Sequence, residues 1–310
     1  MTNQYGFTCD TVISYNLVLP NGTATTFTST SNPDLFFALK GGLNRFGVVT
    51  SIVYHTVPQP NLIYGGLEYY DSVDVPALIN ATYTFLQTNT DPKAQVIFTI
   101  NGGTATAGAI LLAFYDGPRR PAAFDPYNNI IPTSSTLEVQ TFDSFITSAP
   151  TSAFDGQRGA FATLSTAGLT PNFMTAVANE SAFYGTLSAL GGATLLSYDL
   201  EPFMKYGQHA VESAYPHYNS PLPLNLYYAW ESEADDAYWR GIMQQSISYL
   251  TEVAMAEGIY DPNMYAYPNY ALSTYTGDQL YGPTNAARLR EIQSQYDPSG
   301  VMELAGGFSI

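Results

Sequence analysis

Two side chains near the C-terminus have the chemistry and the spacing to act together on one small molecule. Tyr267 and Asn269 are two residues apart, so on an extended segment they point to the same side and Tyr270 points to the other. A phenol and an amide on one face can hold a ligand and bind a substrate hydroxyl. Because a phenol has an unperturbed pKa of about 10, it acts as a base only if a nearby positive charge or the charge of a bound group lowers that pKa. By itself, a Tyr-Pro-Asn-Tyr stretch is also typical of an ordinary loop.

Three glycines precede the strongest strand signal in the chain. After Asn32, a good helix N-cap residue, the sequence predicts a short helix, and the composition of residues 48–57 predicts a strand. Between them lie Gly41, Gly42 and Gly47, which let the backbone come close to a ligand or to another part of the chain. Gly41 and Gly42 can also close the helix in a left-handed conformation. Turns and helix caps account for most such loops, so the spacing alone leaves both interpretations open.

The other reactive side chains form no pattern typical of a metal or nucleophile site. The three histidines, His55, His209 and His217, lack the spacing of metal ligands. There is no Cys-x-x-Cys, His-Glu-x-x-His or Gly-x-Ser-x-Gly motif. The acidic run over 231–236 stands at a predicted helix start, where carboxylates offset the helix dipole. We interpret Cys9, the one cysteine, as a small buried filler, and we predict no metal site.

The composition is that of a folded, acidic protein. Of 310 residues, 45% are hydrophobic and 12% are charged, so the chain can bury a large core and is not expected to be disordered. It carries 10 Lys and Arg against 26 Asp and Glu, a formal net charge of −16. Such a surface repels phosphates, so we expect no nucleic-acid partner. No apolar run has the length of a membrane span, so we expect no membrane partner.

Three glycosylation sequons favour secretion. They begin at Asn21, Asn80 and Asn179, and the low lysine content agrees with a secreted glycoprotein. Met1 is followed directly by polar residues, so this chain shows no signal peptide. An extracellular location is therefore expected for a longer, full-length protein of this kind.

The predicted elements mix hairpins with long helices. Residues 12–19 and 23–30 flank an Asn-Gly pair, the strongest short hairpin signal. Hairpins combined with long helices imply an α+β fold, in which an antiparallel sheet carries helices on one face. A final helix is predicted over 284–296. Between residues 61 and 258, strands are predicted at 62–70, 95–100, 105–115, 159–164, 193–200 and 224–231, and helices after Asp74 and over 171–190 and 234–257.

Three stretches resemble, in the same order, the berberine-bridge-type FAD-linked oxidases of the vanillyl-alcohol oxidase superfamily. Residues 32–50 follow the family pattern Asn-Pro-Asp-Leu-Phe-Trp-Ala-Leu-Lys-Gly-Gly, then Asn, then Phe-Gly-Val-Val-Thr, with Phe37 in the usual place of Trp. Residues 5–12 resemble a Tyr-Gly-x-x-x-Asp-Asn-Val motif. Residues 267–308 resemble the closing segment of the family, including its Tyr-x-Asn-Tyr motif.

The resemblance implies a discontinuous fold. Residues 1–60 would be the C-terminal portion of a PCMH-type FAD-binding domain, and 61–258 the substrate-binding domain, whose antiparallel sheet roofs the flavin. Residues 259–310 would be the berberine-bridge-like segment that returns to the FAD domain. The N-terminal half of that domain, which carries the histidine and cysteine attachment sites of the flavin, would precede Met1. The chain is thus predicted to be N-terminally truncated.

The resemblance also implies site residues. Tyr267 would be the catalytic base, with Tyr270 as the second candidate, and Asn269 would contact the flavin. Pro268 departs from the Leu, Ile or Val common at its place and removes a backbone donor. The cysteine that links the flavin belongs to an upstream motif, so that role is not carried over to Cys9. The positions that would line the adenine and phosphate end of FAD are Gly41, Gly42, Asn44, Gly47, Val48 and Val49.

The predicted activity is that of an FAD-dependent oxidase or dehydrogenase acting on an alcohol carbon of a carbohydrate or secondary metabolite. As the resemblance implies, a tyrosine would take the hydroxyl proton, hydride would pass to the flavin, and molecular oxygen could reoxidise it. We expect a monomer. Two alternatives stay open. The chain could be a truncated, non-catalytic fragment or pseudoenzyme that retains only a substrate-binding domain, because half of the cofactor pocket would be missing. The second alternative is a cofactor-free isomerase or cyclase on the same scaffold.

Overall fold

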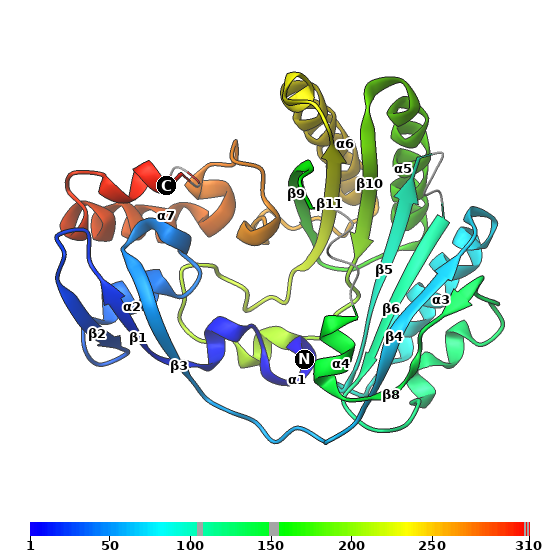
Figure 1. The fold of residues 1–310 in the computed structure, drawn as a ribbon, viewed down its shortest axis with the longest axis horizontal. Coiled ribbons are helices and arrows are strands. Elements are labelled where there is room, and N and C mark those ends of the chain that lie inside the picture. Colours follow the sequence, from blue (N-terminus) through cyan, green and yellow to red (C-terminus); the bar gives the residue numbers. More distant parts are fainter. Residues whose placement is uncertain (104–107, 149–154, 307, 309) are drawn as a thin grey trace.

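Two antiparallel sheets form the framework of the molecule. The computed structural model describes residues 1–103, 108–148, 155–306, 308 and 310. In Figure 1 the two sheets stand apart, with the N-terminal segment between them. The smaller sheet has the strand order β2-β1-β3, and the larger has the order β7-β4-β6-β5-β10-β11-β9, with β8 paired to β4. Helices pack on both sheets, which confirms the predicted α+β fold.

The small sheet contains the predicted hairpin. Strands β1 (Val12–Val18) and β2 (Ala24–Thr28) pair antiparallel around the Asn-Gly turn. Strand β3 (Val48–Tyr54) pairs with the other side of β1. All seven residues of β3 are exposed, although five of the seven are Val, Ile or Tyr. An apolar strand exposed on both faces is unusual for a folded protein.

Helix α2 (Pro33–Leu39) lies where the sequence predicts it, but its caps differ from the prediction. Asn32 adopts a left-handed conformation, and its side chain makes no capping hydrogen bond. Gly41 is left-handed, with φ of 100°, whereas Gly42 has φ of −83° and does not help to close the helix in that way.

Helix α7 (Gly277–Tyr296) begins earlier than the predicted 284–296. Thr276 caps it by accepting from the backbone N–H of Gln279, and the helix continues across a kink at Gly282, where φ is 74°. The N- and C-terminal parts of the chain share one hydrophobic cluster, which includes Leu17, Phe27, Leu35, Phe37, Phe46, Leu280, Tyr281 and Leu289.

The strands predicted for the middle of the chain form the large sheet. The edge strands β7 (Ser134–Ser135) and β8 (Glu138–Gln140) were not predicted, because two or three residues are too few to show alternation. Residues 105–107 of the predicted 105–115 strand lie outside the described residues. The main strands are β4 (Ile63–Tyr70), β5 (Ala94–Gly102), β6 (Gly108–Tyr115), β9 (Arg158–Thr166), β10 (Ala193–Leu200) and β11 (Leu222–Trp230).

Three long helices cover one face of the large sheet, as predicted. They are α3 (Val75–Thr88), α5 (Pro171–Gly191) and α6 (Asp236–Ala256), and they bury aromatic side chains of β10 and β11 beneath them. Two short helices, α1 (Thr2–Tyr5) and α4 (Phe142–Thr147), lie away from this layer. Among the described helices, none has the length and hydropathy that crossing a bilayer requires.

Candidate functional site

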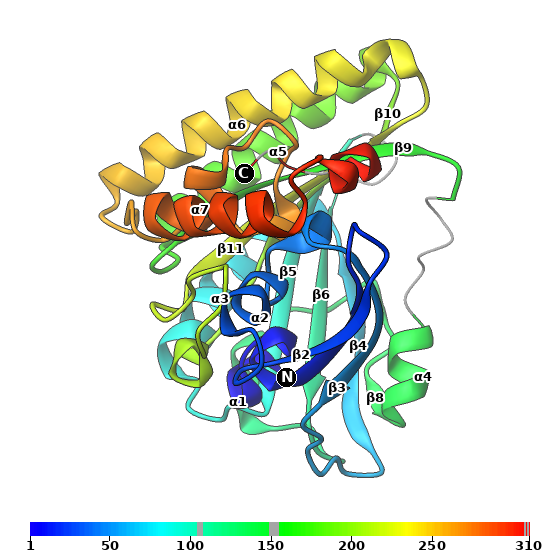
Figure 2. The same ribbon diagram turned by 90° about the vertical axis from the view of Figure 1, so that its left-hand side faces the viewer.

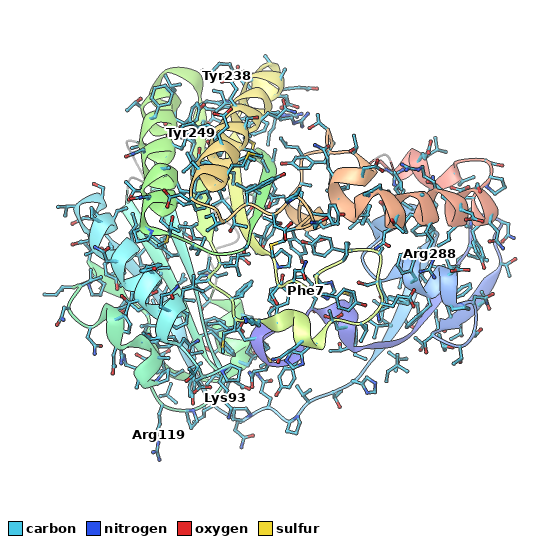
Figure 3. The ribbon with its side chains drawn as sticks, turned by 180° about the vertical axis from the view of Figure 1, so that it is seen from behind. Phe7, Lys93, Arg119, Tyr238, Tyr249 and Arg288 are labelled. Carbon is cyan, nitrogen blue, oxygen red and sulfur yellow. The ribbon has the colours of Figure 1, made fainter. Side chains whose placement is uncertain are left out.

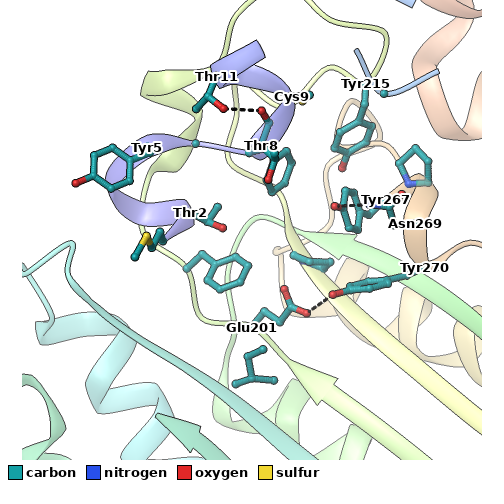
Figure 4. Close-up of a pocket in the computed structure, with 18 of the residues that line it drawn as sticks. Thr2, Tyr5, Thr8, Cys9, Thr11, Glu201, Tyr215, Tyr267, Asn269 and Tyr270 are labelled. Atoms are coloured by element: carbon teal, nitrogen blue, oxygen red, sulfur yellow. Dashed lines mark hydrogen bonds between the residues drawn. The ribbon is translucent and has the colours of Figure 1, made fainter. Parts of the chain in front are cut away.

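A cavity of about 550 Å³ lies between the N-terminal segment and the uncovered face of the large sheet. Its walls come from the 3₁₀ turn η1 (Thr8–Thr11) and the residues before it, from the end of β10, and from the 3₁₀ turn η8 (Pro268–Tyr270). Tyr267, Asn269 and Tyr270 all line this cavity (Figure 4). The two predicted catalytic residues and the predicted amide contact therefore lie together.

The backbone is extended at Tyr267 but turns from Pro268 to Tyr270, so the prediction that Tyr270 points away from the other two was wrong. Tyr267 precedes η8, and Pro268, with its fixed φ, begins the turn. The turn brings Tyr270 into the cavity instead of pointing it away, and the rings of Tyr267 and Tyr270 meet edge to face at 5.0 Å. Asn269 Nδ2 donates a hydrogen bond of 2.7 Å to the hydroxyl of Tyr267, so this pair does share one side.

The hydroxyl of Tyr270 donates to a buried carboxylate that the sequence did not single out. Its partner is Oε1 of Glu201, at 2.9 Å (Figure 4). Glu201 directly follows β10 and lines the same cavity. Because the two residues are 69 positions apart, only the fold reveals the contact. The one available signal is the Asp-x-Glu spacing of Asp199 and Glu201, which puts two acids on one face of a strand.

A row of polar side chains continues from Glu201 across the uncovered face of the sheet. Asp199 accepts hydrogen bonds from Thr99 at 2.7 Å, from Ser197 at 2.8 Å and from Asn225 Nδ2 at 2.9 Å. Asn225 is 6% exposed, and its Oδ1 is buried without a partner among the described residues. A buried acceptor left without a donor costs free energy, and Asn225 does not itself line the cavity.

Burial raises the pKa of the three acids at the centre of the site, Glu201, Tyr267 and Tyr270. Burial raises the pKa of Glu201 to about 8; the hydrogen bond from Tyr270 opposes this shift and the charge of Asp199 adds to it. Burial raises the pKa of Tyr267 to about 12, although the hydrogen bond with Asn269 lowers it. The pKa of Tyr270 is raised by burial and then by Glu201. The charged neighbour that acts on both tyrosines is thus an acid, which raises their pKa values, so the protein itself does not supply the positive charge that would make either of them a base.

Cys9 is not the buried filler that we predicted. It is partly exposed and borders the cavity. Burial raises the pKa of its thiol to about 12, so the thiol keeps its proton and is a poor nucleophile. Behind it, Nε2 of His217 lies 2.9 Å from Oδ2 of Asp10. These two side chains come from positions 207 residues apart, so spacing in the sequence could not show the pair.

The predicted glycine contacts are mostly packing positions in this structure. Gly41 lines the cavity. A Cβ at Gly42 would lie 2.3 Å from the carbonyl oxygen of Ala38, and one at Gly47 would lie 2.5 Å from that of Val18. Both glycines therefore allow close approach within the chain itself. Of the remaining predicted contacts, Asn44 donates to the carbonyl of Gly306 at 3.3 Å, and Val48 and Val49 are exposed on β3; none of the three lines the cavity.

Comparison with known proteins places this fold and site. The chain is 30% identical, over an alignment of 325 residues, to the FAD-dependent monooxygenase drtC of Aspergillus calidoustus; the match covers 99% of this chain and 61% of the relative. The chain is therefore similar to FAD-dependent oxidoreductases, although it spans less than two thirds of this relative, and it shares the fold of berberine bridge enzyme, a solved structure with a TM-score of 0.71 at 14% identity. Glucooligosaccharide oxidase from Acremonium strictum has a TM-score of 0.76 at 17% identity, and 6-hydroxy-D-nicotine oxidase from Arthrobacter nicotinovorans has 0.75 at 16% identity; each match covers 97% of this chain and 66% of the solved one. No family model matches.

The cavity fits one end of the cofactor of this FAD-dependent family. Gly41, Tyr267 and Asn269 offer a close backbone, an aromatic ring and an amide, which suit a planar ring with hydrogen-bonding edges. The described lining residues include no lysine or arginine, the side chains that pair best with phosphates. These three residues would therefore hold the flavin ring, and the lining of the cavity does not supply charged groups for the diphosphate.

Proposed function

We propose that this chain supplies the substrate site and the proton acceptor of an FAD-dependent oxidoreductase that oxidises an alcohol carbon. The observation that carries the proposal is the hydrogen bond from Tyr270 to Glu201, in the same cavity as Tyr267 and Asn269. Oxidation of an alcohol removes a hydroxyl proton and a hydride. The site therefore needs a proton acceptor next to the place of the cofactor.

In this proposal Glu201 is the final proton acceptor and Tyr270 passes the proton to it. A substrate hydroxyl that donates to the hydroxyl oxygen of Tyr270 gives up its proton there, while Tyr270 passes its own proton to Oε1 of Glu201. No phenolate has to accumulate, which agrees with the raised pKa of both tyrosines. FAD, when bound, supplies the acceptor for the hydride. Tyr267 and Asn269 orient the reactants.

We propose a hydroxyl-rich substrate, a carbohydrate or a secondary metabolite. Support comes from the hydrogen-bonding side chains that line the cavity, among them Glu201, Tyr267 and Asn269, which suit the hydroxyls of a ligand. Phe161 stacks on Tyr227 at 4.7 Å and lies 6.0 Å from Tyr270, so it offers a flat surface to a ring. The glucooligosaccharide oxidase shares the fold with this chain. Molecular oxygen as the final electron acceptor is part of the same proposal.

A second candidate is a binding module without catalysis. It is favoured by the lack of lysine and arginine among the described residues that line the cavity. A diphosphate held without such donors would lose much of its binding energy. In this case the polar side chains that line the cavity would bind the hydroxylated ligand, but no redox reaction would follow.

The visible absorption spectrum of the purified chain with added FAD separates the two candidates. Protein-bound flavin bands that are bleached by a sugar or alcohol would support the oxidoreductase. In that case Glu201→Gln should retain the flavin bands and bleach at least about 100-fold more slowly. A chain that retains no FAD but binds the same sugars in calorimetry would instead support the binding module.

We also propose that the protein is an extracellular glycoprotein modified at Asn21. This sequon lies in the exposed turn between β1 and β2, whereas the hydroxyls of the other two sequons, Thr82 and Ser181, are buried in helices. Expression through a eukaryotic secretory route should give a glycan that is lost in Asn21→Gln. Mass spectrometry of the tryptic peptides would check this, and an unmodified Asn21 would reject it.

A further inference from the structure

The ring of His217 is buried, and both of its nitrogens face hydrogen-bond acceptors. Nδ1 lies 2.8 Å from the carbonyl oxygen of Tyr215. Nε2 lies 2.9 Å from Oδ2 and 3.1 Å from Oδ1 of Asp10. A carbonyl oxygen and a carboxylate oxygen can only accept, and a neutral imidazole has one N–H to donate. The two side chains therefore hold one proton more than a neutral imidazole and a carboxylate would.

The other contacts of Asp10 assign that proton to the imidazole. Oδ2 also accepts the backbone N–H of Phe7 at 2.8 Å, and Oδ1 accepts that of Val211 at 3.1 Å. Both oxygens thus receive donors, an arrangement that favours an ionised carboxylate over a carboxylic acid. The pair is 1% and 2% exposed, so water cannot replace these contacts.

Cys9 stands next to this pair, and together the three residues place a sulfur, a carboxylate oxygen and a ring nitrogen within 4.8 Å of one another. The geometry nevertheless fits a proton better than a metal ion. Two ligands about 2.0–2.2 Å from a tetrahedral zinc lie about 3.3–3.6 Å apart, whereas Nε2 and Oδ2 are at hydrogen-bond distance. The ionisable groups around the pair are Cys9, Lys40, Tyr206, Glu212, Tyr215 and Tyr218.

We infer that Asp10 and His217 form a buried carboxylate–imidazolium pair that positions Tyr267 in the cavity. Phe7 lies 4.8 Å from the ring of His217 and stacks on Tyr267 at 5.4 Å. Tyr215 lies parallel to His217 at 5.9 Å and meets Tyr267 at 5.5 Å. The pair joins the segment of Phe7 to the segment of Tyr215, and these two rings flank Tyr267. In Figure 3, Phe7 lies at the centre of the molecule.

The positioning role rests on the proposed function of Tyr267, but the protonation of the pair does not. His217 therefore acts through Phe7 and Tyr215 and is a positioning residue. Loss of the extra proton would leave one ring nitrogen facing an acceptor without a hydrogen, and the contact between the two segments would weaken. The pair thus makes the packing around Tyr267 depend on charge.

Nitrogen NMR of a chain with one histidine tests the protonation directly. The sequence has three histidines, so replacing His55 and His209 by Asn leaves His217 as the one histidine, while Asp10 keeps its donors Phe7, Val211 and His217. At pH 7, where a free imidazole is mostly neutral, both nitrogens should show the chemical shifts of an N–H. A neutral ring would overturn the inference. Addition of one equivalent of Zn²⁺ should leave the spectrum unchanged, and a stoichiometric change would show a metal site instead.

Fluorine NMR tests the positioning. With 3-fluorotyrosine incorporated, the signal of Tyr267 is assigned by its loss in Tyr267→Phe. It should shift or broaden in Asp10→Asn. It should stay unchanged in Asp236→Asn, which breaks the ion pair between Asp236 on α6 and Arg158 on β9, outside the cavity lining. If Asp10→Asn does not fold, the chain with Asp10 and His217 intact is titrated with acid and base instead. The nitrogen signals of His217 and the fluorine signal of Tyr267 must then change over the same pH range. A Tyr267 signal that does not change when the pair is altered would reject the positioning role. FAD binding and flavin bleaching would still test the proposed function independently.

Discussion

Glu201 links the chemistry of the cavity to pH. Its pKa is raised to about 8 by burial, and only its ionised form can accept a proton from Tyr270. We therefore predict that kcat/KM for an alcohol substrate rises as the pH rises through about 8. Glu201→Gln should lower kcat/KM at least about 100-fold and remove this rise. Initial rates between pH 5.5 and 9.5 check the prediction; a profile that is flat or falls across pH 8 contradicts it.

The same group makes stability depend on pH. The folded pKa of about 8 lies above the ordinary value of 4.5, so folding favours the protonated form. The resulting stability is fully present below about pH 4.5 and is lost as the pH rises through 8. Between those limits the contribution of Glu201 should fall by on the order of 2–4 kcal/mol. Urea unfolding at pH 5 and pH 9 measures the change in the free energy of unfolding. Glu201→Gln should remove the share of that change that comes from Glu201. An equal slope in the variant would mean that other groups cause it.

The two tyrosines should respond differently to loss of their hydroxyls. Tyr270→Phe removes the donor to Glu201, so kcat should fall about 100-fold or more. Tyr267→Phe removes only the contact with Asn269, so kcat should fall less than about tenfold, with KM rising. Steady-state kinetics of both variants decide between them. The reverse order would return the role of base to Tyr267, as the sequence predicted.

The motif residues of the site could be recognised from the sequence, but their partners could not. Tyr267, Asn269 and Tyr270 stand in a motif, and all three line one cavity. Glu201 and His217 come from ordinary-looking stretches, and each gains its meaning from a contact 69 or 207 residues away. Burial, which the sequence does not show, raises the pKa of Tyr267, whereas action as a base would require a nearby cation or the charge of a bound flavin to lower it.

At the scale of elements, the glycines after α2 should matter for folding. A Cβ at Gly42 would meet a backbone oxygen at 2.3 Å, so Gly42→Ala should lower the free energy of unfolding by about 2 kcal/mol or more. Gly241→Ala is the matched control, because it lies within α6 with nothing inside 4 Å; it should be neutral or stabilising by up to about 1 kcal/mol. Denaturant unfolding compares them. A stable Gly42→Ala chain with weakened FAD binding would favour the ligand contact predicted from the resemblance.

Long elements were predicted well because their patterns repeat over many residues. The strands of the large sheet and helices α5 and α6 lie within a few residues of the predicted bounds. The turn η8 was not predicted, since three residues carry no periodicity, and this error also misplaced Tyr270. The predicted start of helix α7, at residue 284, was too late because Gly and Pro at 282 and 283 are typical of a helix break. In the structure the helix begins at Gly277 and continues through a kink at Gly282.

At the scale of the molecule, the most unusual surface feature is β3, an apolar strand whose residues are all exposed. Val48 is 60% exposed and Val53 is 46% exposed. They lie opposite Val18 and Ser14 across a bulge in the pairing with β1, so they belong to the same face of the small sheet. The strand pairs on one side with β1, and among the described residues no further strand joins it. Exposed edges of this kind recruit other chains. The monomer expected from the sequence would require this surface to be covered.

We predict that the 310-residue chain self-associates through β3, and that its net charge of −16 limits the effect at low salt. Because salt screens that repulsion while apolar contact persists, the average mass should rise with ionic strength and with protein concentration. Val48→Lys combined with Val53→Lys should abolish the rise. Val73→Lys is the control, since Val73 is 81% exposed but lies outside the small sheet. Light scattering after size exclusion measures the masses. A chain that stays monomeric at high salt, or a control that acts like the double variant, would show that β3 is not the contact.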